Sequence, residues 1–185
     1  MGDYNTDDLA SGTATKRESR MMTGLFRDRE SAEGAYRSLS SRGYGKDDVN
    51  LLMSDDTRKK HFTEGDTELG TKAWEDAGKG AAIGGGVGAT LAAIAAIGTT
   101  LALPGLGLLI AGPIAALLAG GGAGALTGGL IGALVGHGIP EEHAKVYDKG
   151  IRDGGIVMGV NPRSQEDADY LENEFRTNRA ESLYR

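Results

Sequence analysis

The side chains that could act as acids, bases or nucleophiles are few in this chain of 185 residues. Carboxylates are paired at Asp55-Asp56 and at Glu141-Glu142, and the two members of each pair are adjacent. We interpret the first pair as a solvated turn and the second as a helix start, where negative charge interacts favourably with the helix dipole. Ser54 and His61 lie near each other in sequence, but no nucleophile motif surrounds them. The sequence therefore predicts that the protein is not an enzyme.

Potential metal ligands are equally sparse. The chain has no cysteine, and its three histidines are His61, His137 and His143. His137 and His143 are six residues apart, a spacing that does not place them on one helix face. A zinc site needs three or four ligands that converge. We therefore expect no metal site.

Glycine-rich segments raise the alternative of a phosphate-binding loop. A P-loop ends in Gly-Lys-Ser/Thr, whereas Gly78-Lys79 is followed by Gly80. Gly84, Gly86 and Ala89 match a loose dinucleotide fingerprint, but a largely polar stretch precedes them where a strand is required. The acidic residue that should follow about 20 positions later is absent. We expect no nucleotide and no other cofactor.

Charge divides the chain into three parts. Residues 1–79 carry 13 basic and 16 acidic residues, residues 141–185 carry 7 and 10, and residues 80–140 carry none. Two acidic flanks thus enclose a neutral block, and the absence of a basic surface excludes nucleic-acid binding. The basic run at 58–61 is interpreted as a solvated turn, with contact to anionic lipid as the alternative.

Periodicity in the flanks predicts the elements that position these residues. Residues 1–20 contain no apolar core of a secretory signal and are expected to be a disordered tail. Residues 21–62 read as strand 22–26, helix 28–43 and strand 49–54. Residues 63–79 are a connector. Residues 139–178 read as a helix from Pro140 to Gly154, strand 156–160 and a helix capped by Ser164, and residues 179–185 are a C-terminal tail.

The two flanks together predict one α+β domain. Neither has enough apolar surface to fold comfortably alone. Combined, they form a small, ferredoxin-like-type three-stranded sheet covered by helices. The neutral block is then an insertion whose two ends lie close together.

Small residues recur every four positions in this block, at 80–138. One ladder comprises Gly80, Gly84, Gly88, Ala92, Ala96 and Thr100, and a second comprises Gly120, Gly124, Gly128, Gly132 and Gly136. Such ladders let two helices approach closely. Leu126, Leu130 and Leu134 fall on the face opposite the second ladder. The spacing predicts an all-helical glycine-zipper hairpin.

The length of the hairpin favours a membrane. Residues 79–102 and 113–136 each form a helix of about 36 Å, against a hydrocarbon core of about 30 Å. The turn PGLGLLIAGP has no polar residue, which fits a re-entrant or protein-buried hairpin better than two full spans. The alternative is a hairpin packed inside a soluble homo-oligomer.

Two segments carry a family resemblance. TGLFRDRESAEGAYRSLSSRGYGKDDVNLLMSDDTRKKHF at 23–62 and GGIVMGVNPRSQEDADYLENEF at 154–175 resemble the heat-induced general stress protein family of the YflT type. The glycine-rich block resembles members whose stress domain is interrupted in this way. The resemblance covers nearly everything after residue 20. It implies a bacterial, stress-associated protein and supplies no catalytic residues.

These observations lead to one functional expectation and one alternative. We expect a non-enzymatic, stress-associated homo-oligomer that inserts in or docks on a lipid membrane through the hairpin, with both flanks on the cytoplasmic side. The alternative is a regulatory α+β module that binds a small ligand or a protein. In that case the hairpin is an anchor or a soluble oligomerisation element.

Overall fold

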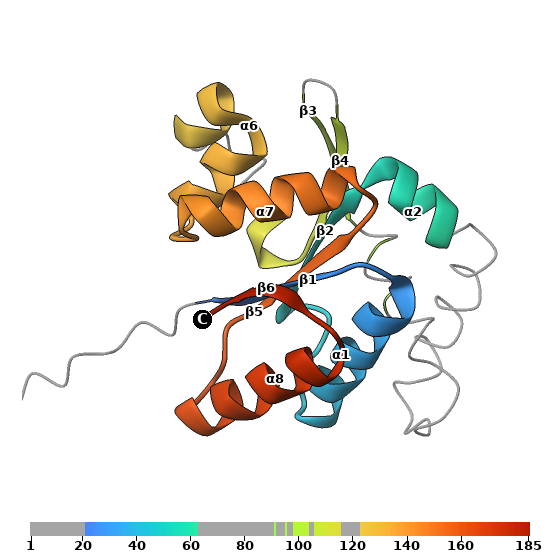
Figure 1. Ribbon diagram of the computed structural model, residues 1–185, viewed down its shortest axis with the longest axis vertical. Coiled ribbons are helices and arrows are strands. Elements are labelled where there is room, and N and C mark those ends of the chain that lie inside the picture. Colours follow the sequence, from blue (N-terminus) through green and yellow to red (C-terminus); the bar gives the residue numbers. More distant parts are fainter. Residues whose placement is uncertain (1–20, 63–90, 92–94, 96–97, 104–105, 116–122) are drawn as a thin grey trace, which may run out of the picture.

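The computed structural model describes residues 21–62, 91, 95, 98–103, 106–115 and 123–185 (Figure 1). The expectations for the tail 1–20 and for the connector 63–79 lie outside these residues.

A six-stranded sheet forms the centre of the molecule. Its order is β3-β4-β2-β5-β1-β6, and every neighbouring pair is antiparallel. The strands are β1 (Met22–Phe26), β2 (Val49–Ser54), β3 (Thr99–Leu103), β4 (Leu106–Ala111), β5 (Ile156–Val160) and β6 (Glu181–Tyr184). The α+β class is confirmed. The expected three-stranded sheet is too small: β2, β5 and β1 are adjacent as expected, but β3, β4 and β6 extend the sheet on both sides.

The described helices are α1 (Arg29–Ser41), α2 (Asp55–His61), α6 (Ala123–Gly136), α7 (Glu141–Arg152) and α8 (Gln165–Thr177). Three of them begin at side-chain caps. Asp28, Ser54 and Ser164 accept hydrogen bonds from the backbone N–H three residues further on, which begins α1, α2 and α8. The periodicity of the flanks thus locates α1, α7 and α8 within one or two residues.

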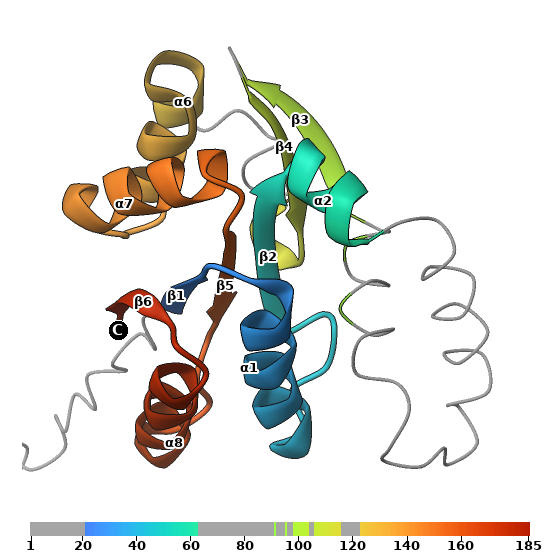
Figure 2. The ribbon, with the colours of Figure 1, turned by 45° about the vertical axis from the view of Figure 1, so that its right-hand side comes forward.

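The sheet lies between two layers of helices. Helices α1 and α8 cover one face, and α6 and α7 lie on the other (Figures 1 and 2). On the α1 side the core includes Phe26, Leu39 and Phe175, whereas on the α7 side it includes Leu25, Tyr147 and Ile151. Alternate residues of β1 therefore point into different cores, so this strand is buried throughout.

The hairpin of β3 and β4 contradicts the all-helical insertion. Residues 99–111 were expected to end one helix and to form the turn before the next, but they pair as strands in register from Thr99↔Ile110 to Leu103↔Leu106. Strand β4 also pairs with β2. Leu108 and Ile110 enter the α7-side core, and Leu109 and Ala111 enter the α1-side core. A strand buried on both faces has no polar alternation, so its sequence resembles a buried helix.

Two further segments differ from expectation. The tail expected at 179–185 contains β6, which pairs with β1 at the edge of the sheet. The turn expected at Asp55-Asp56 and at 58–61 is helix α2, whose N-cap is Ser54. Asp55 pairs with Arg58 and Lys59 within this helix, an arrangement that supports a helical turn.

Helix α6 contains a break. Gly129 has φ 57° and ψ −144°, so two helical pieces meet there rather than one continuous helix. Among the described residues, no helix is both long enough and apolar enough to cross a membrane.

Candidate functional site

The structure places only part of the predicted small-residue ladders. Five members, Gly124, Gly128, Gly132, Gly136 and Thr100, lie in described elements, and the others, Gly80, Gly84, Gly88, Ala92, Ala96 and Gly120, lie outside the described residues. Thr100 lies in strand β3 and therefore does not belong to a helical ladder. The remaining four lie on α6, where the break at Gly129 separates Gly124 and Gly128 from the rest.

Helix α6 presents two different faces. Leu130, Ala133 and Leu134 are buried in the core that α6 shares with α7. Gly128 and Gly136 are exposed, and no atom of the described residues lies within 4 Å of a methyl group built on either. Val135, beside Gly136, is 42% exposed. Leu130 and Leu134 are thus buried while Gly128 and Gly136 are exposed, as the spacing predicts, whereas Gly132 is half-buried. The small face of α6, defined by Gly128 and Gly136, faces open space.

The first ladder segment packs differently where it is described. Leu91 and Ala95 are helical and buried, and both belong to the α1-side core. This part of the neutral block therefore packs within the α+β domain and is not a separate hairpin.

A polar pocket of about 480 Å³ lies at one end of the sheet, where β1 and β2 end and β5 begins. These two strands run in the same direction, since both are antiparallel to β5, so their carboxyl ends meet at this edge. The pocket is lined by Arg27, Ser54, Asp56, Thr57, Lys60, His61, Arg152, Asp153 and Gly154.

The lining combines three cations with two carboxylates, in a chain whose net charge is −6. Lys60 has no ion-pair partner among the described residues. The other two cations are held by carboxylates: Nε of Arg27 lies 2.8 Å from Glu181, and Nε of Arg152 lies 2.9 Å from Asp148. Burial, together with the charges of Lys60 and Arg29, holds the pKa of His61 below its ordinary value. Lys60 is therefore the cation of this lining whose charge is not offset by an ion pair within the described residues.

Two buried hydroxyls form one wall of this pocket. Thr57 is 3% exposed and Ser54 is 6% exposed, and their oxygens lie 2.8 Å apart. Ser54 Oγ also accepts a hydrogen bond from the backbone N–H of Thr57. Only one of the two hydroxyl protons is used in their mutual bond, so the other is left to donate.

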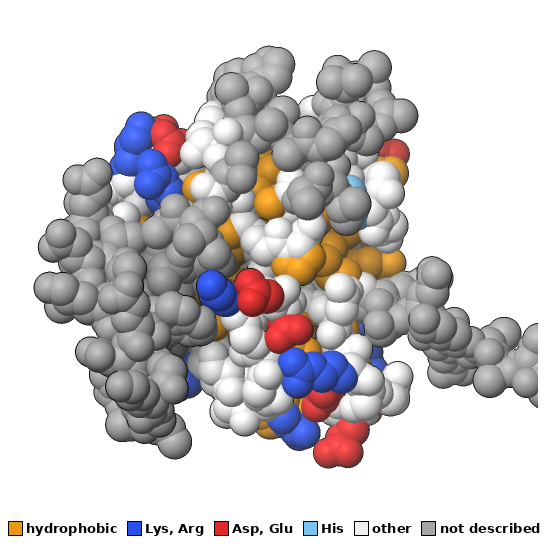
Figure 3. Space-filling view, turned by 180° about the vertical axis from the view of Figure 1, so that it is seen from behind, with side chains coloured by type: hydrophobic (Ala, Val, Ile, Leu, Met, Phe, Trp, Pro, Cys, Tyr) orange, Lys and Arg blue, Asp and Glu red, His pale blue; other side chains and the backbone are white. Residues whose placement is uncertain are grey.

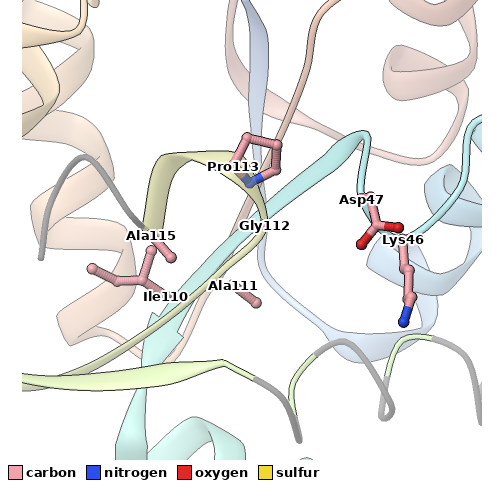
Figure 4. A pocket seen from close by; sticks show the side chains of 7 residues that line it. All are labelled: Lys46, Asp47, Ile110, Ala111, Gly112, Pro113 and Ala115. Atoms are coloured by element: carbon pink, nitrogen blue, oxygen red, sulfur yellow. The ribbon is translucent and has the colours of Figure 1, made fainter.

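A second pocket, of about 350 Å³, lies beside the end of β4 (Figure 4). Ile110, Ala111 and the residues that follow line one side, and Lys46 and Asp47 come from the loop before β2. Gly112 has φ 92°, and a Cβ there would lie 2.1 Å from the carbonyl oxygen of Val49, so only glycine fits. The predicted break at Gly112 is thus real, but it follows a strand. The lining offers few converging polar groups.

The other candidate residues lie apart from both pockets. His143 Nδ1 contacts Ser182 Oγ at 3.0 Å, and His137 Nδ1 contacts the carbonyl oxygen of Ala133 at 2.8 Å. Glu141 and Glu142 lie in the first turn of α7, as expected. Within the described ranges, no three His, Asp or Glu side chains are grouped as a metal site.

Charged side chains are unevenly placed on the surface. Seen from behind, they lie mainly over the lower half, where α1 and α8 pack, and at the upper left, where α2 lies, with an apolar band between them (Figure 3). The basic residues of α2 include Lys60, which was expected to lie in a solvated turn. Arg27 and Arg152 were not singled out, because 125 residues separate them and no sequence motif joins them.

The fold and the site define an α+β protein with an antiparallel sheet of six strands between two helical layers. Comparisons with protein-family models, with curated proteins and with solved structures found no match to this chain.

Proposed function

We propose that the protein is a non-enzymatic, self-associating α+β protein, and that the small face of α6 packs against the same face of a second copy. The observation that carries this proposal is the open space in front of Gly128 and Gly136. Glycine exposed on a helix costs about 1 kcal/mol relative to alanine. A close helix contact in the assembled state offsets that cost.

A second copy fits this face better than an unrelated protein does. Residues 123–136 contain no charged side chain, so two copies of the face meet without electrostatic repulsion. A two-fold contact is self-complementary, and repeated small residues meet that requirement because neither surface has protruding side chains. The exposed Val135 supplies apolar area at the margin.

We also infer a ferredoxin-like core within the larger sheet. The order β2-β5-β1-β6, with α1 and α8 on one face, corresponds to a β-α-β-β-α-β unit into which residues 55–155 are inserted between β2 and β5. The assignment to stress-associated proteins rests on the resemblance of residues 23–62 and 154–175. The proposal for a membrane rests on the neutral composition of residues 80–140.

Cysteine crosslinking tests self-association directly, because the chain has no cysteine of its own. Val135 on α6 and Val146 on α7 are 42% and 40% exposed, so Val135→Cys and Val146→Cys form a matched pair. We expect mild oxidation of the full chain to give disulfide-linked dimers for Val135→Cys and little for Val146→Cys. Equal crosslinking of the two variants would contradict the proposed contact.

Sizing of a bulky variant provides the second measurement. Gly128→Leu with Gly136→Leu adds bulk to the open face, and a Cβ at either position meets no atom within 4 Å. We expect the fold to be retained and the assembly to be reduced to monomers. Val146→Leu is the control. If the wild-type chain sediments as a monomer both alone and with lipid vesicles, self-association is wrong. If the wild type and the bulky variant pellet with vesicles to the same extent, this face does not bind lipid, and if both sediment as the same assembly, it does not bind a second copy.

A further inference from the structure

The polar pocket beside α2 has the features of a binding site and is independent of the α6 face. It has a volume of about 480 Å³, within the range of small-molecule sites. Its lining comes from β1, β2 with α2, and the α7–β5 turn. Three separate parts of the chain therefore converge on one space at the end of the sheet.

The donors in this pocket suit an oxyanion. Arg152 binds Asp148 through Nε and Nη2, which leaves Nη1 with its N–H groups. Arg27 contacts Glu181 through Nε and Asp153, at 3.8 Å, through Nη1, which leaves Nη2. The carboxylates thus fix both guanidinium groups while each keeps donors for a ligand.

Lys60 and the hydroxyl pair complete the donor set. Lys60 is the cation of the pocket that has no partner among the described residues. The Ser54–Thr57 pair retains one hydroxyl proton at the buried wall. Ammonium, guanidinium and hydroxyl donors around one space are the groups that bind phosphate.

Gly154 keeps the pocket open at this wall. Its φ is 93°, and a Cβ built there would lie in van der Waals contact with Thr57 Oγ1, at 3.8 Å. Any other residue would be strained and would project toward the donors. Asp56 also lines the pocket, and its negative charge weakens the binding of an anion there.

We propose that this pocket binds a small, soluble phosphate-bearing molecule, with Lys60 as the principal cation and Arg27, Arg152 and the Ser54–Thr57 pair as further donors. The volume exceeds what a free phosphate ion needs, so a phosphate monoester is the expected ligand.

The test is titration of the full chain with inorganic phosphate and with glycerol 3-phosphate. Calorimetry measures the binding, and the NMR signal of the His61 imidazole reports its pKa. Burial, with the charges of Lys60 and Arg29, holds the pKa of His61 low, and a bound anion raises it. We expect saturable binding of both probes and an upward shift of this pKa. Absence of saturable binding would overturn the proposal.

Two variants of α2 distinguish binding at this pocket from general electrostatic attraction to the protein surface. Lys60→Gln removes the unpaired cation and weakens binding about tenfold or more, as expected for a lost charged hydrogen bond. Lys59→Gln removes the same charge from the adjacent residue, which pairs with Asp55 at 2.6 Å and does not line the pocket. It should weaken binding less than about threefold. Equal losses in the two variants would overturn the site.

Two more measurements complete the test. Asp56→Asn removes a repulsive charge and strengthens binding about threefold or more. Vesicles of phosphatidylcholine with and without phosphatidic acid supply the same chemistry from a lipid headgroup. Lys60-dependent binding to phosphatidic acid vesicles, without binding of either soluble probe, would overturn the proposal of a soluble ligand.

Discussion

Thr23 and Tyr147 lie 124 residues apart in sequence, and their hydroxyl oxygens are 2.8 Å apart inside the layer between α7 and the sheet. Both side chains are buried. The Tyr147 hydroxyl also donates to the carbonyl oxygen of Ser182 on β6, at 2.6 Å. Tyr147 therefore joins α7, an inner strand and the edge strand β6.

Loss of the Tyr147 hydroxyl should weaken this junction. Tyr147→Phe leaves the Thr23 hydroxyl and the Ser182 carbonyl without this partner, and should lower the free energy of unfolding by about 1–3 kcal/mol. Tyr184→Phe is the control, because its hydroxyl bonds to the Gly138 carbonyl oxygen at 3.2 Å in an exposed position. Denaturant unfolding measures both. Equal losses of stability in the two variants would show that the buried hydrogen bonds of Tyr147 stabilise the fold no more than the exposed one of Tyr184.

Alkaline pH should destabilise the fold through the same residue. Burial raises the pKa of Tyr147 to about 12 from its ordinary value of 10.0. Between these values the unfolded chain has lost the proton and the folded chain keeps it, so stability is full below pH 10 and falls as pH rises to about 12. The fall amounts to at most about 2–3 kcal/mol. The stability difference between wild type and Tyr147→Phe, measured from pH 9 to 12, should shrink accordingly; a constant difference refutes this.

Two neighbouring glycines of α6 should respond in opposite directions to alanine. Gly128 lies in open space, so Gly128→Ala should raise the free energy of unfolding by up to about 1 kcal/mol. Gly129 has φ 57° and ψ −144°, a conformation that side chains disfavour, so Gly129→Ala should lower it by about 1–3 kcal/mol. Thermal unfolding under conditions that keep the chain monomeric compares them. Effects of the same sign would contradict the break in α6.

The contact between Gly150 and Leu25 sets how closely α7 approaches the sheet. A Cβ on Gly150 would lie 2.4 Å from Leu25 Cδ2. Gly150→Ala should therefore destabilise the fold by about 1–3 kcal/mol despite its better helix propensity. Lys149→Ala is the exposed control. In a double-mutant cycle with Leu25→Ala, the combined loss should be smaller than the sum of the single losses; strict additivity would contradict this contact.

The cap of α1 should depend on acid. Asp28 accepts hydrogen bonds from the Ser31 backbone N–H at 2.8 Å and from its hydroxyl at 3.0 Å, and the backbone bond holds the pKa of Asp28 below its ordinary value. At neutral pH, Asp28→Ala should cost about 1 kcal/mol and Asp28→Asn much less. The ionised Asp28 cap stabilises the folded protein fully at pH values above the ordinary pKa of aspartate. This stabilisation is lost as the pH falls through the lowered pKa of the folded state. The wild-type advantage over Asp28→Asn should thus disappear in acid, as followed by chemical denaturation; its persistence in acid would refute this.

Local sequence patterns were enough to locate the helices that have one apolar and one polar face. Helices α1, α7 and α8 each have one apolar face and a cap or an acidic first turn, and these signals are local. The sequence also indicated that Gly112 breaks the chain and that Leu130 and Leu134 oppose the exposed glycines of α6. These properties follow from backbone geometry and from the helical repeat.

The other elements and the polar pocket depend on contacts between distant parts of the chain. Strand β4 is buried on both faces, so its apolar run carried no period that distinguishes strand from helix, and its pairing with β2 set the outcome. Strand β6 is short and partly exposed, and it is a strand because β1 offers it an edge. The polar pocket unites Arg27, Lys60 and Arg152 from three elements. No local pattern encodes that meeting, because long-range pairing of the strands brings these residues together.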